Sequence, residues 1–257
     1  MEDDTMASTI MDRYFDIAVE YLKRIRAEES ERISVAAGLI ADQIRQDKLV
    51  YIWGPGGHSN INAMEVFFRA GGLMHISAIL DEGTLLSNGA LRSMEIERTP
   101  GYGRVVILDN RIQKGDLFIV ANAYGINCAC LDAALTCKEL GATTIAVTSL
   151  EHSTHTAKDH PARHPTKLDL YEACDYYIDS KVPVGDAVVD VEGIPQKMGA
   201  ISSIVNAFIM NSLMMEAAEI LGREGREVPV WRSGNCAGGD EWNARFTDRF
   251  RGKVRWM

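Results

Sequence analysis

Apolar residues recur at three- and four-residue intervals through the first 45 positions, which is the spacing of amphipathic helices. The pattern covers residues 10–25, breaks near Glu29 and Ser30, and resumes over residues 33–44. We therefore expect two helices at the N-terminus, paired as a helical hairpin within residues 1–47.

Between residues 49 and 178 the apolar residues gather instead into short, almost unbroken runs. Such runs are typical of strands buried on both faces of a parallel sheet. They lie at residues 49–53, 116–121, 143–147 and, shorter, 176–178. Helical spacing over residues 61–70 and 128–140 separates them, which gives the crossover unit of a sheet with helices on both faces. The pattern predicts a three-layer α/β/α sandwich with a central parallel sheet.

The composition is that of a globular protein, with 257 residues, 46% hydrophobic and 25% charged, so wholesale disorder and fibrous proteins are excluded. At about 150 residues per domain, the length favours one domain over residues 1–257 with terminal extensions. The net charge is −9 and no block of like charges occurs. Phosphate contacts would need basic patches, so we expect no nucleic-acid partner.

The five cysteines form no CxxC pair, and the acidic N-terminus lacks the basic start and apolar run of a signal peptide. Both features predict a cytoplasmic protein. The longest apolar stretch, residues 200–221, includes Ser202, Asn206 and Glu216 and falls short of the roughly 20 uninterrupted apolar residues that span a bilayer. We expect no membrane partner. The C-terminal region, residues 199–257, is predicted to be a helix and tail, with the helix buried in the core or at the interface of a homodimer or homotetramer.

Three polar loops follow the predicted strands, at residues 54–60, 122–127 and 148–153. In open parallel sheets, ligands bind where strands end and helix N-termini begin, because free backbone amides point there. Glycine and asparagine also serve simply as turn formers. Three such loops at equivalent ends of one sheet favour a ligand site. The first loop matches neither the GxGxxG fingerprint nor a P-loop.

With these features the chain resembles the sugar isomerase (SIS) domain family. It resembles more closely an uncharacterised branch of that family, whose members are called phosphoheptose isomerases or sugar isomerase domain proteins. The segments that carry the resemblance span nearly the whole chain: residues 54–59, 63–72, 145–153, 183–187 and 238–243. The resemblance implies a flavodoxin-like fold that binds phosphosugars. This fold hosts isomerases, an etherase, synthase domains and sensors, so it does not by itself fix the function.

The chain departs from the family pattern in the second loop and near the C-terminus. SIS domains usually hold the phosphate with serines or threonines in a Ser-x-Ser-Gly pattern, where this chain has Asn122 and Tyr124 before Gly125. Amide and phenol groups still donate hydrogen bonds, so these three residues remain candidate ligand contacts. The related branch also tends to carry a histidine where this chain has Trp242.

Glu65, His58 and His152 are the candidate catalytic residues. The resemblance places Glu65 where phosphoheptose isomerases carry an active-site histidine, and partial burial would suit it as the base of an aldose–ketose isomerisation. The alternative is an ordinary helix carboxylate paired with Arg69. His58 in the first loop, or His152 after the third strand, would act as the acid at the sugar carbonyl.

The other candidate sugar-binding residues lie in the three loops and at later turns. They are Gly56, Gly57, Ser59, Asn60, Asp81, Asn127, Thr148, Ser149, Ser153, Asp186, Lys197 and Ser202. His152, His155, His160 and His164 are close enough in sequence to suggest zinc. No carboxylate motif or compact Cys/His framework accompanies them, so we expect no metal and no cofactor.

The sequence therefore predicts an enzyme that isomerises a sugar phosphate, or a similar acidic sugar, through an enediol. A non-catalytic phosphosugar sensor and a related lyase or etherase are the alternatives. The altered second loop favours the sensor, whereas the chain shows no appended DNA-binding domain or basic patch through which a sensor would act.

Overall fold

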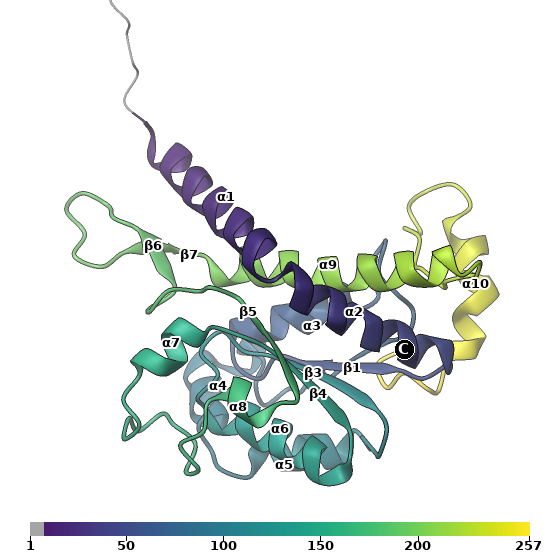
Figure 1. Ribbon diagram of the computed structural model, residues 1–257, viewed down its shortest axis with the longest axis horizontal. Helices are drawn as coiled ribbons and strands as arrows, with labels where there is room; N and C mark the ends of the chain where they lie inside the picture. The colour runs from purple at the N-terminus through teal and green to yellow at the C-terminus, as the bar shows by residue number, and fades with distance from the viewer. Residues whose placement is uncertain (1–7) are drawn as a thin grey trace, which may run out of the picture.

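A five-stranded parallel sheet forms the centre of the protein (Figure 1). The structure is a computed structural model that describes residues 8–257. The strand order is β2-β1-β3-β4-β5, with β1 (Val50–Trp53), β2 (Ile76–Ala78), β3 (Leu117–Ala121), β4 (Thr143–Thr148) and β5 (Tyr176–Asp179). The predicted sandwich with a central parallel sheet is confirmed.

Helices cover both faces of the sheet, because alternate residues of each strand point to opposite sides. On one side, Ile52 and Ile119 share a core with helices α2 (Ser30–Arg45), α3 (Ile61–Val66) and α9 (Ser202–Arg223). On the other side, Trp53 and Phe118 share a core with helices α5 (Tyr102–Asp109), α6 (Cys128–Leu140) and α8 (Leu170–Ala173). Each such buried side chain contributes roughly 1.5–3 kcal/mol, and together they fix both layers on the sheet.

The two N-terminal helices form one bent rod, so the predicted helical hairpin is wrong (Figure 1). Helix α1 (Ile10–Glu28) is separated from α2 by Glu29 alone. The amide of Glu29 still donates to the carbonyl of Ile25, and its own carbonyl accepts from the amide of Ile33. A single residue held in this way leaves no room for the chain to reverse.

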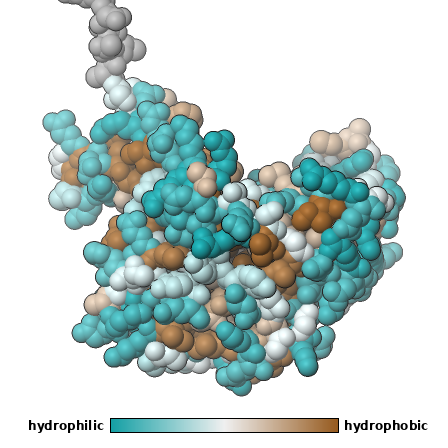
Figure 2. Space-filling model, in the orientation of Figure 1, coloured by the Kyte–Doolittle hydropathy of each residue, from teal (hydrophilic) through white to brown (hydrophobic). Residues whose placement is uncertain are grey.

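Helix α1 leads away from the sheet and packs on an antiparallel β-hairpin that the pattern did not predict (Figure 1). The hairpin consists of β6 (Ala187–Val189) and β7 (Met198–Ala200). The hydroxyl of Tyr14 donates to the carbonyl of Ala200 over 2.7 Å. We call α1 and this hairpin the arm. Figure 2 shows hydrophobic surface on the arm, where Met11 and Phe15 are exposed.

The helix predicted over residues 61–70 ends at Val66, where α3 stops. Phe67 is extended and Phe68 has a positive φ of 46°. Tertiary hydrogen bonds account for the early stop, because the amide of Gly71 donates to the carbonyl of Trp231 over 2.8 Å. The chain therefore leaves the helix to reach the C-terminal region.

The C-terminal region holds two helices, α9 and α10 (Gly239–Phe250). By length and composition, α9 is the one helix among residues 8–257 that is apolar enough to cross a bilayer. Its buried face packs on α2 and α3. Helix α10 lies over the amino end of β1, where Phe246 and Phe250 pack on Leu49.

Candidate functional site

A polar cavity of about 290 Å³ lies at the carboxyl ends of β1 and β3. Loops after both strands line it, together with α3, α4 (Ala90–Glu97), the base of the arm and the start of α9. The lining residues are Gly57, His58, Ser59, Asn62, Leu86, Ala90, Ser93, Met94, Glu97, Asn122, Ala123, Tyr124, Asn127, Asp186, Ala200, Ser202, Ser203 and Asn206. Eight of the sequence-predicted site residues are among them.

The loop after β1 is folded tightly and leaves its amides free. A Cβ on Gly54 would lie 1.7 Å from the carbonyl oxygen of Ser59, so only glycine fits there. The side-chain amide of Asn60 ties the loop by donating to the carbonyl of Gly56 over 2.9 Å. Within the described residues, the amides of Gly57, His58 and Ser59 find no acceptor. Adjacent free amides of this kind make a concave site for an anion.

Asn122 holds the loop after β3 with both ends of its side chain. Its Oδ1 accepts from the amides of Tyr124 and Gly125, over 3.1 and 2.8 Å, and its Nδ2 donates to the carbonyl of Pro55 over 2.7 Å. These two amides are therefore not free for a ligand. Helix α6 starts just beyond, at Cys128, without a side-chain cap, so its first amides can receive an anion.

Glu97, at the end of α4, is the acidic group of this cavity that the sequence did not reveal. A Cβ on Gly56 would lie 1.7 Å from its Oε2, so the glycine makes room for the carboxyl group. Within the described residues, this carboxyl group has no hydrogen-bond or ion-pair partner. Burial raises the pKa of Glu97 to about 7, against the opposing effect of the positive charge of Arg98. A carboxyl group that titrates near neutral pH is suited to both accept and return a proton.

Tyr124 and His152 form a stacked pair beside the cavity. Their ring centroids are 3.9 Å apart and the planes are inclined by 20°. Burial raises the pKa of Tyr124, helped by the charges of Asp186 and Glu97, so its phenol stays protonated. Burial also lowers the pKa of His152 to about 4, so its imidazole is neutral at pH 7. Tyr124 lines the cavity as a hydrogen-bond donor, and His152 supports its ring from behind.

Asp186 and Ser202 join the base of the arm to the start of α9. Asp186 has a positive φ of 67°. Its Oδ1 accepts from the amides of Ile201 and Ser202, over 3.0 and 2.8 Å, and its Oδ2 accepts from the Ser202 hydroxyl over 2.7 Å. The carboxylate thus occupies the N-terminus of α9 and fixes this corner of the cavity.

Glu65 does not line this cavity. Its Oε1 accepts from the side-chain Nδ2 of Asn211 over 3.2 Å and lies 3.2 Å from Nε of Arg69. The ion pair with Arg69 is the one expected if Glu65 is an ordinary helix carboxylate. Asp81 also lies outside the cavity, where Tyr102 donates to it over 2.9 Å. Lys197 lies on the arm, more than half exposed, 3.7 Å from Asp190.

Most of the predicted residues of the third loop are buried beneath the site. Ser149 caps helix α7 (Leu150–His155) by accepting from the amide of His152. The Ser153 hydroxyl donates back to the carbonyl of Ser149 over 2.9 Å, and Thr148 lies against Gly125. These side chains hold α7, and hence His152, in place.

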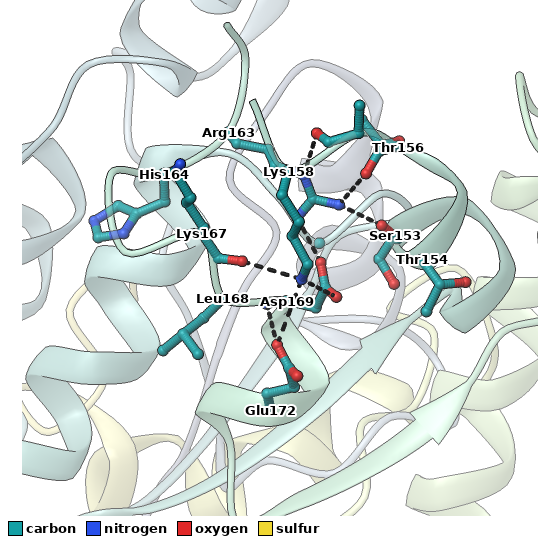
Figure 3. Close-up of polar contacts among 12 residues, drawn as sticks. Ser153, Thr154, Thr156, Lys158, Arg163, His164, Lys167, Leu168, Asp169 and Glu172 are labelled. Carbon is teal, nitrogen blue, oxygen red and sulfur yellow. Dashed lines mark hydrogen bonds and ion pairs between the residues drawn. The ribbon is translucent and has the colours of Figure 1, made fainter. Parts of the chain in front are cut away.

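Arg163 anchors the segment that follows α7 (Figure 3). Its guanidinium is almost fully buried and pairs with Asp169 over 2.6 Å. It also donates to the carbonyls of Ser153 and Thr156 at the end of α7. Lys158 reaches the other oxygen of Asp169 over 2.8 Å. In residues 8–257, no group of three or more His, Cys, Asp or Glu side chains is placed to hold a metal ion.

Comparison with known proteins agrees with this architecture. The SIS domain profile matches residues 13–149. A UPF0309 protein of Geobacillus thermodenitrificans is 34% identical over 245 residues, which is 95% of this chain and 96% of the relative. The chain belongs to the SIS domain family. Another UPF0309 protein, from Halalkalibacterium halodurans, is 35% identical over 241 residues, 94% of each chain.

The solved structure of the phosphoheptose isomerase from Neisseria gonorrhoeae has the same fold. The two structures superimpose with a TM-score of 0.50 and 14% sequence identity, over 83% of this chain and all of that one. Within this SIS domain, the unusual Asn122 is explained by its role in holding its loop. Trp242 does not contact this loop. Its indole N–H donates to the carbonyl of Val230, and the guanidinium of Arg232 stacks on its ring.

Proposed function

We propose that this SIS protein binds a sugar phosphate in the cavity and interconverts its aldose and ketose forms through an enediol. The observation that carries the proposal is the Glu97 carboxyl group, partly buried in the cavity and packed against the glycine loop. The phosphoheptose isomerase with the same fold supports the choice of substrate class. Free amides at Gly57 to Ser59 and at the start of α6 suit the phosphate.

In this proposal Glu97, rather than Glu65, is the base. Its carboxylate removes the proton from the carbon next to the carbonyl group, and the electron pair of that C–H bond forms the enediol double bond. The same group returns the proton to the neighbouring carbon. Tyr124, a neutral donor, hydrogen-bonds to the carbonyl oxygen as negative charge develops there. The proton of the neighbouring hydroxyl group moves to this oxygen, so that the former carbonyl becomes a hydroxyl group and the former hydroxyl group becomes the new carbonyl. His58 lies exposed at the rim of the cavity, where it can contact the ligand.

A phosphosugar sensor is the second candidate, and the loop after β3 favours it. Asn122 occupies the amides of Tyr124 and Gly125, so the phosphate is held by fewer groups than in a loop with free amides. A sensor needs binding alone and gives Glu97 no chemical task. The isomerase accounts for Glu97 and is therefore preferred.

Proton NMR in D₂O, on aldose and ketose phosphates of five to seven carbons, tests the proposal. We expect deuterium to enter at C1 or C2 together with the signals of the isomeric sugar. Line broadening of a sugar phosphate without deuterium entry would favour the sensor. No effect on any of the sugars would contradict both.

A further inference from the structure

Asn206 is a buried polar residue in an otherwise apolar stretch of α9. Its neighbours Val205, Ile209 and Met210 are fully buried in the core, and Asn206 itself is 2% exposed. Its Oδ1 is closed off from solvent and has no hydrogen-bond partner among residues 8–257. The same side chain lines the cavity. It is therefore a buried amide that the folded chain leaves unsatisfied.

The other amide side chains of the cavity all have partners. Asn62 donates to the carbonyl of Ser59 over 2.9 Å, and Asn127 donates to the carbonyl of Ala162 over 3.0 Å. Asn122 makes the loop contacts described above. An unpaired buried polar group is unfavourable for folding, and an apolar residue would suit the surroundings of Asn206 better. Its presence calls for a partner that is not part of the chain.

We propose that Asn206 binds a hydroxyl group of the sugar and selects for sugars that carry it. This inference rests on the proposed function. The amide offers one donor end and one acceptor end, so it can pair with a hydroxyl in either direction. Rotation of the side-chain amide by 180° exchanges its oxygen and its nitrogen. This rotation breaks no hydrogen bond to Oδ1, because Oδ1 has no partner among the described residues. Ser203, three residues earlier and on the same wall, can bind a neighbouring hydroxyl.

Such a contact gives strong discrimination. A site built around a hydrogen bond to a substrate hydroxyl rejects analogues that lack it, because its own buried polar group is then left unpaired. Asn206 is thus a specificity-determining residue on the α9 side of the cavity, whereas Glu97 acts from α4. A deoxygenated sugar phosphate should bind more weakly for this reason.

The test compares Asn206→Leu with Asn211→Leu, a matched change five residues further along α9. Asn211 lies outside the cavity and donates to Glu65 and to the carbonyl of Ala207. We expect Asn206→Leu to keep or raise the melting temperature and Asn211→Leu to lower it. If Asn206→Leu lowers the melting temperature as much as the control, Asn206 is a structural residue and the proposal is overturned, whatever the ligand.

Binding is measured by calorimetry with open-chain alditol phosphates of five, six and seven carbons, which have no carbonyl group to react. We expect Asn206→Leu to weaken the best probe by about 10- to 100-fold and Asn211→Leu to leave it within about twofold. Asn206→Asp, which keeps an acceptor, should recover part of the loss. Equal binding by wild type and Asn206→Leu would overturn this proposal alone. If the wild type bound no probe, the proposed function itself would fail.

Discussion

At the scale of single residues, the Glu97 carboxyl group is held in place at a cost in stability. Burial raises its pKa to about 7, compared with an ordinary value of 4.5. Between these pH values the unfolded chain releases the proton and the folded chain keeps it, so stability falls as the pH rises. The full cost, on the order of 3 kcal/mol, is reached above pH 7.

Glu97→Gln removes this ionisation, so we expect the variant to be more stable than the wild type at high pH. The difference in melting temperature should be small at pH 4.5 and grow to roughly 5–10 °C by pH 8. Thermal unfolding followed across this pH range provides the measurement. Glu95→Gln, an exposed change on the same helix, is the control and should show no such trend. A difference that does not vary with pH would contradict the burial of Glu97.

Gly56 gives a second prediction, because its missing side chain makes room for Glu97. An alanine Cβ would lie 1.7 Å from Oε2 of Glu97, at a φ of 112° that favours glycine. We expect Gly56→Ala to displace the carboxyl group and reduce isomerisation at least tenfold, with a loss of roughly 1–3 kcal/mol in stability. Gly38→Ala, in α2 with open space around it, should leave activity unchanged and stabilise by up to about 1 kcal/mol. Full activity in Gly56→Ala would refute this arrangement.

At the scale of elements, the buried Arg163 connects helix α7 to α8. Its guanidinium binds the carbonyls at the end of α7, and its partner Asp169 caps α8 (Figure 3). Helix α7 in turn carries His152, which supports the Tyr124 ring. The position of Tyr124 in the cavity therefore depends on an ion pair outside it.

We expect Arg163→Met to lower the melting temperature by roughly 10 °C, because it leaves the buried Asp169 and the carbonyls of Ser153 and Thr156 with fewer partners. Turnover should fall as well, through the loss of order in α7. Lys158→Met removes the half-exposed partner of the same carboxylate and should cost no more than about 1 kcal/mol. Equal effects of the two variants would show that the burial of Arg163 contributes little.

Four of the five strands of the sheet could be predicted from the sequence, because each contains a nearly continuous apolar run, whereas β2 (Ile76–Ala78) is only three residues long and was not predicted. The early end of α3 at Val66 could not be predicted, since it depends on Trp231, a residue far along the chain. The two loops of the site could be predicted because each directly follows one of these apolar runs. Glu97 was missed because α4 lies outside these loops and only the fold brings it to Gly56. The β-hairpin of the arm has short strands without a clear alternating pattern.

At the scale of the whole molecule, the arm exposes apolar surface away from the sheet (Figure 2). The groove between α1 and the hairpin is lined almost entirely by apolar groups, among them Ile10, Met11 and Met198. Exposed apolar surface of this kind is typical of contacts between subunits. It supports the expected homodimer or homotetramer.

Analytical ultracentrifugation at micromolar concentration tests this expectation. The wild type should sediment as a dimer or tetramer, and a Met11→Ser, Met198→Ser double variant should shift towards the monomer without loss of helix content. Val105→Ser, which also removes an exposed apolar side chain but lies on α5, should not change the assembly. A monomeric wild type would contradict the assignment of the arm as a subunit contact.

The proposed role of Glu97 as the base of a sugar phosphate isomerase can be tested by comparing three proteins. The rate of deuterium entry at C1 or C2 of the best sugar phosphate is measured for the wild type, Glu97→Gln and Glu65→Gln. Since positioned acid–base groups contribute about 10²- to 10⁴-fold, we predict a loss of this size in Glu97→Gln and a loss below tenfold in Glu65→Gln. Exchange at the wild-type rate in Glu97→Gln, or a large loss in Glu65→Gln alone, would show that Glu97 is not the base.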